Sequence, residues 1–378
     1  MGAPQVHGRC DPRFAAARDA FEANLKSGAD VGASFAATID GELVVDLWGG
    51  FKDAAGTEPW EEDTIVNVYS TTKTMCALTA LLCADRGLIA FDDPVAKYWP
   101  SFAENGKRDI TVGQLMSHSS GLSGFEKKIE PGELYDWDHV CRLLAHQTPW
   151  WEPGTRSGYH AITQGYLVGE VVRRATGKTL GTVFREEIAG PLGADFHIGL
   201  PPEADARAGE LIPPEKGLLA ATPGGDIARR TLGNPTLSAL EPRHTPWRRA
   251  EIPAAGGFGN ARSVARIQAI LANGGAAGGK RFLSEAGARK ALELQVDNTD
   301  LVLGIPVRFG LGYGMPSLVV PFPHENTVFW GGWGGSLIVV DYDARMTFAY
   351  VMNRMNSTTT GDARVAGMIM GMFGGLAA

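Results

Sequence analysis

The sequence reads Tyr69-Ser70-Thr71-Thr72-Lys73 immediately before an apolar segment, residues 74–83. Apolar side chains recur in that segment at the spacing of one helical face, which predicts a helix over 71–85. Ser70 then lies at the first turn of the helix, near unpaired backbone N–H groups and the positive end of the helix dipole. Lys73 lies on the same face, one turn further along. The stretch therefore predicts a serine and a lysine side by side at a helix N-terminus.

This arrangement can turn a serine into a nucleophile. A serine hydroxyl reacts poorly until a neighbouring base takes its proton. A free lysine has a pKa of about 10.4 and is protonated at neutral pH, but burial and the helix N-terminus would both lower the pKa of Lys73. The alternative is a capping Ser70 with a surface lysine, because a two-residue pattern occurs about once by chance in a chain of this length. The motif needs support from elsewhere in the chain.

A second stretch, Ser157-Gly-Tyr159-His160-Ala161, directly precedes a helix predicted over 161–175. A tyrosine at a loop-to-helix junction can present its hydroxyl to a cleft and relay a proton to a leaving group. His160 is a competing general base, and a tyrosine that only packs its ring is the structural alternative. We prefer Tyr159, because a serine–lysine system needs no imidazole.

A third stretch, Trp330-Gly-Gly-Trp-Gly-Gly-Ser336, enters a predicted strand. Its glycines leave a backbone that a substrate can approach closely. A free N–H in this stretch, together with the N–H of Ser70, could bind the oxyanion that develops during acyl transfer. The alternative is a tight bend between two strands.

The order of predicted elements places strands at both ends of the chain and helices between them. A hairpin is expected at Asp40-Gly41, which lies between two β-rich runs. Loops with short helical pieces are expected over 200–257, where proline and glycine are frequent. Further helices are expected over 12–27, 111–117, 261–273 and 361–373, and further strands over 326–331, 335–341 and 345–352. This order predicts an α/β sheet that the C-terminus completes, with a mostly helical lobe inserted in the middle.

Composition narrows the class of protein. The chain has 378 residues, of which 44% are hydrophobic and 20% charged, as in an ordinary globular protein. The net charge of −7 argues against nucleic-acid and acidic-membrane partners. We expect no membrane span, because no apolar run approaches about 20 residues. Residues 1–14 hold charged side chains and no apolar stretch, so we expect no secretory signal and a cytoplasmic location.

Other chemistries lack their sequence signals. The cysteines, Cys10, Cys76, Cys83 and Cys141, form no Cys-x-x-Cys pair and are expected to be reduced thiols. No histidine or cysteine cluster has the spacing of metal ligands, so no metal site is expected. No Gly-x-Ser-x-Gly nucleophile elbow is present, which argues against an α/β-hydrolase. No phosphate loop or dinucleotide fingerprint appears, and we expect no cofactor.

Taken together and in this order, the three stretches resemble the serine β-lactamase and penicillin-recognising superfamily. Within it the chain most resembles class C β-lactamase-like proteins and family VIII carboxylesterases, and the resemblance covers roughly residues 12–376. Further matching stretches are Gln114-Leu-Met-Ser-His-Ser-Ser-Gly-Leu122, Ala254-Ala-Gly-Gly257 and Phe348-Ala-Tyr-Val-Met-Asn-Arg354. The resemblance implies a β-lactamase/DD-peptidase-like fold of the α+β type. An antiparallel sheet domain (1–73 and 240–378) and a helical domain (74–239) would enclose the active site between them.

The resemblance also implies roles for individual residues. Ser70 matches the nucleophile of the family and Lys73 its partner base. Tyr159 matches the first residue of the family's Tyr-x-Asn element, the proton relay. Trp330-Gly331-Gly332 falls where β-lactamases have Lys-Thr-Gly. The next residue, Trp333, would therefore donate the second oxyanion-hole N–H, along with Ser70.

Two departures from the β-lactamase pattern point to esters. Ala161 stands where β-lactamases and peptidases have an asparagine, and Trp330 replaces the lysine that would pair with a β-lactam carboxylate. Loss of a charged partner weakens the binding of an anionic ligand. Phe125 and Trp150 are expected to join Trp330 in an apolar substrate pocket. We therefore predict a serine carboxylesterase that hydrolyses small, mainly short-chain esters through a Ser70 acyl-enzyme.

The alternatives are a class C-like β-lactamase or D-amino-acid peptidase, an acyltransferase on the same scaffold, and a non-catalytic descendant that only binds ligands. Weak β-lactam hydrolysis is compatible with the esterase prediction, because the acylation machinery is shared. The non-catalytic reading is disfavoured because nucleophile, base and tyrosine all remain. The oligomeric state is left open.

Overall fold

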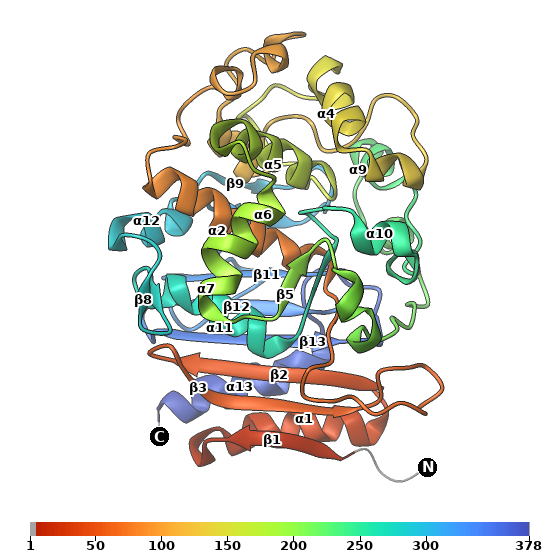
Figure 1. Cartoon of the computed structure of the whole chain (residues 1–378), viewed down its shortest axis with the longest axis vertical. Coiled ribbons are helices and arrows are strands. Elements are labelled where there is room, and N and C mark those ends of the chain that lie inside the picture. Colours follow the sequence, from red (N-terminus) through yellow and green to blue (C-terminus); the bar gives the residue numbers. More distant parts are fainter. Residues whose placement is uncertain (1–4, 378) are drawn as a thin grey trace.

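Strands from the two ends of the chain meet in one antiparallel sheet. The computed structural model describes residues 5–377, and its main sheet has six strands in the order β1-β3-β2-β13-β12-β11 (Figure 1). The strands are β1 (Val6–Cys10), β2 (Gly32–Ile39), β3 (Glu42–Gly50), β11 (Thr327–Gly331), β12 (Leu337–Asp341) and β13 (Met346–Met352). β13 pairs with β2, from Met346 opposite Ile39 to Met352 opposite Ala33. The C-terminal strands thus complete a sheet that the N-terminal hairpin begins, which confirms the predicted fold class.

The hairpin predicted at Asp40-Gly41 joins β2 to β3. Both turn residues have a positive φ, 52° for Asp40 and 83° for Gly41. A two-residue turn of this kind matches the right-handed twist of the strands, and aspartate and glycine tolerate the conformation. The strands predicted over 326–331, 335–341 and 345–352 are also confirmed, as β11, β12 and β13.

Helices cover both faces of the sheet. α1 (Ala15–Ser27) and α13 (Ala363–Leu376) pack against each other, and Figure 1 shows them at the level of strands β1, β2 and β3. α11 (Ala261–Ala272) packs on β2, β12 and β13. The hydroxyl of Thr347 in β13 donates to a backbone carbonyl of α11, whereas the ring of the next residue, Phe348, packs against α13. Successive side chains of a strand point to opposite faces, so α11 and α13 lie on opposite sides of the sheet.

The middle of the chain is mostly helical, as predicted. Its helices are α2 (Thr72–Asp85), α3 (Val112–Met116), α4 (Trp137–His146), α5 (Thr163–Thr176), α6 (Leu180–Phe184) and α7 (Gly190–Leu192). α5 packs against α2, α3 and α4. Every residue from Thr72 to Cys83 is buried, which explains why α2 is apolar on several faces. The domain boundaries at 73 and 240 stay a prediction.

The region from 200 to 257 has long connections and the short helices α8 (Leu218–Ala221), α9 (Asp226–Leu232) and α10 (Thr245–Arg249), as predicted. A small sheet that the sequence did not indicate joins β4 (Val66–Asn67), β6 (Gly257–Gly259) and β5 (Phe196–Ile198), in the order β4-β6-β5. It fixes the chain just before Ser70 against the end of this region. The remaining elements are α12 (Glu285–Arg289) and the pairs β7 (Ala276–Ala277) with β8 (Lys280–Arg281) and β9 (Val296–Thr299) with β10 (Pro306–Phe309).

Two further predictions concern cysteines and the membrane. All four cysteines are free thiols, and Cys76, Cys83 and Cys141 are buried. This agrees with their predicted role as small apolar core residues. Within residues 5–377, no helix has both the length and the apolar character needed to cross a bilayer.

Candidate active site

Ser70 is held by an unusual backbone conformation at the start of α2. It lies in a short 3-10 turn, Tyr69–Thr71, that leads directly into the helix. Tyr69 has a φ of 45°, a conformation that bulky residues rarely adopt. Its backbone N–H donates to Asn67 Oδ1 (3.2 Å) and its hydroxyl donates to the carbonyl of Ala239 (2.9 Å). Such strained residues persist where the surrounding contacts fix them, and they are frequent at active sites.

Lys73 Nζ lies against the Ser70 hydroxyl, at 3.2 Å from Oγ. The ammonium also donates to the backbone carbonyls of Ala161 (2.7 Å) and Ala254 (2.9 Å). Lys73 is fully buried, and no carboxylate in the described part of the chain forms an ion pair with it. Burial therefore lowers the pKa of Lys73 to about 7. Near neutral pH a substantial fraction of the amine is neutral and able to accept a proton.

Tyr159 contacts Ser70 from the other side. Its hydroxyl donates to Ser70 Oγ over 2.6 Å, and Lys73 Nζ lies 4.9 Å from the centre of its ring. Burial raises the pKa of Tyr159, and the hydrogen bond with Ser70 only partly offsets that effect. The phenol is therefore protonated at neutral pH and can give a proton to a leaving group. Ser70, Lys73 and Tyr159 form one connected cluster, as the sequence predicts.

Asp300 anchors the backbone of Tyr159 and was not foreseen from the sequence. Its Oδ1 atom accepts the N–H of Tyr159 (3.0 Å) and those of Val302 and Leu303 (2.8 Å each). The carboxylate is buried, and its negative charge raises the pKa of Tyr159. The contacts with Val302 and Leu303 are a local aspartate turn that sequence can suggest. The contact with Tyr159 spans 141 residues and leaves no such signal.

His160, the competing base, does not contact Ser70. Its Nδ1 hydrogen-bonds the carbonyl of Gly158 (2.6 Å) and its Nε2 pairs with Ser120 Oγ (2.7 Å). A carbonyl only accepts hydrogen bonds, so Nδ1 carries the proton and Nε2 accepts from the serine. Burial lowers the pKa of His160 to about 3. The ring is a neutral structural group with both nitrogens occupied.

The glycine-rich turn after β11 lies against the segment that carries Ser70. A Cβ added at Gly332 would lie 2.1 Å from the carbonyl oxygen of Val68, so only glycine fits. Ser336 Oγ bridges the same two segments, at 2.9 Å from Thr71 Oγ1 and 3.0 Å from the Val68 carbonyl. The backbone N–H of Trp333, between them, has no acceptor among residues 5–377. It is free to receive an oxyanion.

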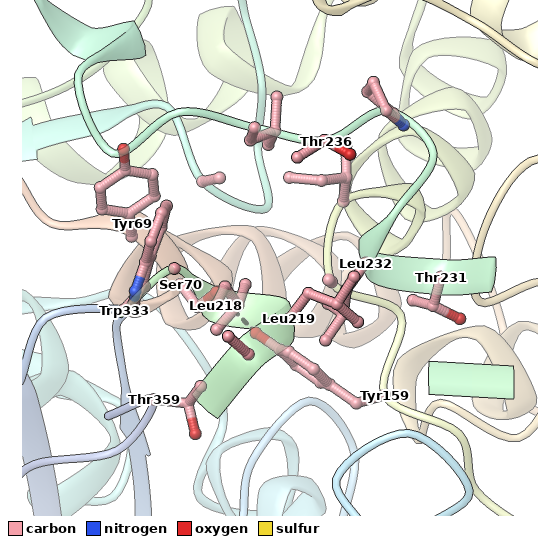
Figure 2. Close-up of a pocket in the computed structure, with 17 residues that line it drawn as sticks. Tyr69, Ser70, Tyr159, Leu218, Leu219, Thr231, Leu232, Thr236, Trp333 and Thr359 are labelled. Atoms are coloured by element: carbon pink, nitrogen blue, oxygen red, sulfur yellow. Dashed lines mark hydrogen bonds between the residues drawn. The ribbon is translucent and has the colours of Figure 1, made fainter. Parts of the chain in front are cut away.

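Ser70, Tyr159 and Trp333 line one cavity of about 460 Å³ (Figure 2). Figure 2 shows the Tyr159 hydroxyl directed at Ser70, with Leu218 and Leu219 beside them. The rest of the wall is predominantly apolar and includes Ile162, Leu218, Leu219, Leu232, Pro235 and Leu237. None of the lining residues carries a charge. The cavity thus suits an uncharged substrate group next to the Ser70 hydroxyl.

Comparison with known proteins identifies the family. The family described as Beta-lactamase matches residues 17–367. The chain belongs to the β-lactamase family. It is 38% identical to Esterase/beta-lactamase LipL of Mycobacterium tuberculosis, over 93% of this chain and 84% of that protein.

Two solved structures resemble the chain over nearly its whole length. One is a family VIII carboxylesterase, with 42% identity, a TM-score of 0.93, and coverage of 98% of this chain and 99% of that one. The other is a penicillin-binding protein homologue from Caulobacter crescentus, with 38% identity, a TM-score of 0.92, and coverage of 98% and 100%.

Trp330, which stands where β-lactamases have a lysine, belongs to an aromatic cluster beside Tyr159. Its ring stacks on that of His118, with centroids 5.4 Å apart and planes 18° from parallel. Trp330 lines a second cavity of about 350 Å³, which shares Tyr159 and Thr359 with the first. An aromatic side chain therefore lies where a lysine would pair with the carboxylate of a β-lactam. This agrees with the prediction from the sequence that the site does not favour an anionic β-lactam.

Phe125 and Trp150 were expected in the substrate pocket, but neither residue lines either cavity. Both side chains are engaged elsewhere in the protein. Trp150 contacts both members of the Arg230–Glu126 ion pair at the surface. The centre of its ring lies 4.0 Å from the Arg230 guanidinium, and its N–H donates to the Glu126 carboxylate (2.7 Å). Phe125 is buried in the core. Gly331 and Gly332 also lie outside both linings, because they pack on Thr360 and Val68. The leucines of α8 and α9 form the wall instead.

One group of metal-ligand side chains occurs in the described residues: His324, Asp341 and Asp343, whose ligand atoms lie within 4.8 Å of one another. Asp341 is the last residue of β12, whereas Leu337, at the other end of the strand, pairs with Gly331. Its oxygens already accept hydrogen bonds from the His324 ring (2.7 Å) and the N–H of Ala344 (2.9 Å). These contacts account for the group without an ion, and it lies away from the Ser70 cluster.

Proposed function

We propose that this chain is a serine carboxylesterase that hydrolyses small, mainly short-chain carboxylic esters through an acyl-enzyme on Ser70. The observation that carries the proposal is the position of Ser70 Oγ, 3.2 Å from Lys73 Nζ and 2.6 Å from the Tyr159 hydroxyl. The β-lactamase family uses a serine–lysine–tyrosine set at the matching motifs. A relative named as an esterase and a related structure titled as a carboxylesterase support the reaction class.

Acylation begins when the Ser70 proton moves to neutral Lys73, directly or through Tyr159. Ser70 Oγ then bonds to the ester carbonyl carbon, and the carbonyl oxygen takes the negative charge. The N–H groups of Ser70 and Trp333 stabilise that oxyanion where it develops. Lys73 and Tyr159 share one proton network, so the pair as a whole acts as the base.

Collapse of the tetrahedral intermediate breaks the bond to the alcohol oxygen, and Tyr159 donates the proton that the leaving alkoxide needs. Tyr159 recovers that proton from Lys73, which carries the one taken from Ser70. Water then attacks the Ser70 ester while the same pair accepts its proton. The acid leaves and the Ser70 hydroxyl is restored.

The cavity favours esters over charged amides. Its lining has no charged side chain, and its walls are leucine, proline and aromatic residues. An anionic substrate would lose hydration there without gaining an ionic partner. Ala161 contributes a backbone carbonyl to Lys73 and only a methyl group to the cavity. Neutral acyl groups are the chemistry that fits.

A β-lactamase or D-amino-acid peptidase is the second candidate, because one relative carries both esterase and β-lactamase in its name. A chromogenic cephalosporin separates the two: turnover faster than that of p-nitrophenyl butyrate would favour the second candidate. An acyltransferase is the third, and capture of the acyl group by an added alcohol ahead of water would favour it.

The proposal is tested with purified protein and p-nitrophenyl butyrate. The wild type should release p-nitrophenol catalytically, and Ser70→Ala should not. Equal turnover by the variant would remove Ser70 from the mechanism.

The cytoplasmic location expected from the sequence stays a prediction, which fractionation of the producing cells can test.

A further inference from the structure

Among residues 5–377, four of the seven large apolar side chains that are exposed to solvent line or adjoin the two cavities. In the described part of the chain, Leu219 is 37% exposed, Ile305 40%, Val319 49%, and Leu318 is fully exposed. Leu219 lines the first cavity and Ile305 the second. Leu318 and Val319 lie between Ser317 and Val320, which both line the second cavity. We call Leu219, Ile305, Leu318 and Val319 the apolar rim.

The three segments that contain the rim residues have no charged side chains. Residues 217–225, 301–307 and 315–323 contain no Asp, Glu, Lys or Arg. They also lie together: a Cβ added at Gly304 would be 3.2 Å from the backbone N of Gly224, and all three segments contribute to the second cavity. Single exposed apolar residues are ordinary on a protein surface, whereas a contiguous uncharged group marks an interaction site.

Arg308 is the one charged residue in the linings of the two cavities. Its guanidinium donates to the carbonyl of Pro316 (2.9 Å) and pairs with Asp297 (3.4 Å). The charge is therefore engaged within the protein. The walls of the two cavities therefore present no unpaired charge between the rim and Ser70.

We propose that the apolar rim docks on the surface of an aggregated, uncharged ester, such as a droplet of short-chain triacylglycerol, and that substrate enters from this surface. The inference rests on the proposed esterase function. The net charge of −7 offers no attraction to an anionic surface. Docking is instead driven by removal of rim side chains from water, and added salt does not weaken it.

The test measures the rate of tributyrin hydrolysis below and above its solubility limit, by titration of the released acid. The wild-type rate should rise again once droplets form. The double variant Leu318→Ser/Val319→Ser should hydrolyse droplets about tenfold more slowly, because two apolar side chains no longer leave water at the droplet surface. Neither residue lines a cavity, so its turnover of dissolved p-nitrophenyl butyrate should equal that of the wild type.

Met370→Ser is the matched control. Met370 is 71% exposed on α13, the helix on the face of the sheet opposite α11, and its loss should leave both rates unchanged. Flotation of Ser70→Ala protein with tributyrin droplets measures docking without turnover. It should match that of the wild type, and the rim variant should stay in the aqueous layer.

Two results would overturn docking at the rim. The wild-type rate could level off at the solubility limit, or the double variant could hydrolyse and float with droplets as Met370→Ser does. Either result leaves the esterase proposal intact, because hydrolysis of dissolved p-nitrophenyl butyrate tests that proposal separately.

Discussion

The Tyr159 hydroxyl donates a 2.6 Å hydrogen bond to Ser70 Oγ, across 89 residues of sequence. The two residues come from different elements, the N-terminus of α2 and the loop before α5. Lys73 contacts the same oxygen from the first turn of α2. The Ser70 hydroxyl is thus the one point at which the proton-handling groups of the site converge.

Replacement of Tyr159 tests its part in proton transfer. Tyr159→Phe keeps the ring and removes the hydroxyl, so kcat should fall by about 10²–10⁴ while KM changes little. Tyr342→Phe is a matched control, because its buried hydroxyl bonds the carbonyl of Ala288 (2.8 Å) rather than Ser70. Activity of Tyr159→Phe within a few-fold of this control would remove the phenol from the mechanism.

The pH dependence follows from Lys73. Burial lowers its pKa to about 7, and only the neutral amine accepts a proton from Ser70. Below that pH, kcat/KM should fall about tenfold for each pH unit. Lys73→Arg should be inactive throughout, because a guanidinium does not deprotonate. A profile that is flat through neutral pH, or an active arginine variant, would contradict the assignment of Lys73.

Gly332 tests the oxyanion hole. A methyl group there meets the Val68 carbonyl at 2.1 Å, so Gly332→Ala must push the turn that carries the Trp333 N–H away from Ser70. We expect a loss of about 10²–10³ in kcat, the usual effect of removing one oxyanion donor. Gly132→Ala is the control, because nothing lies within 4 Å of its added Cβ. Similar kinetics for the two variants would argue against the role given to this turn.

Asp300 is predicted to position Tyr159. Asp300→Ala deprives three N–H groups of their acceptor, which should lower the free energy of unfolding by about 2–4 kcal/mol. Asp300→Asn keeps an acceptor oxygen and removes the charge that raises the pKa of Tyr159. Its kcat and its free energy of unfolding should both be closer to those of the wild type than the values of Asp300→Ala. Equal losses in the two variants would argue against the role given to the acceptor oxygen.

Local sequence signals predicted the elements that depend on local chemistry. Asp40-Gly41 specified the hairpin because few residue pairs accept two positive φ values. The strands near the C-terminus and the limits of α2 followed from apolar runs bounded by turn residues. The motifs around Ser70, Tyr159 and Trp330 are also local patterns, and together they carried the family resemblance that predicted the site.

Features that depend on distant contacts were missed. β1 and the β4-β6-β5 sheet are short, and their pairing partners lie far away in the chain. The wall leucines 218 and 219 lie in a region without periodicity, so nothing local marked them. Phe125 and Trp150 were assigned to the pocket because they are aromatic and near the motifs. Neither property determines the direction of a side chain.

The most direct test of the mechanism is the mass of the protein after reaction with a fluorophosphonate, followed by peptide mapping. We predict a single adduct on the peptide that carries Ser70, formed together with loss of ester hydrolysis and absent from Ser70→Ala. An adduct on another residue, or an unlabelled protein that still hydrolyses esters, would contradict the account.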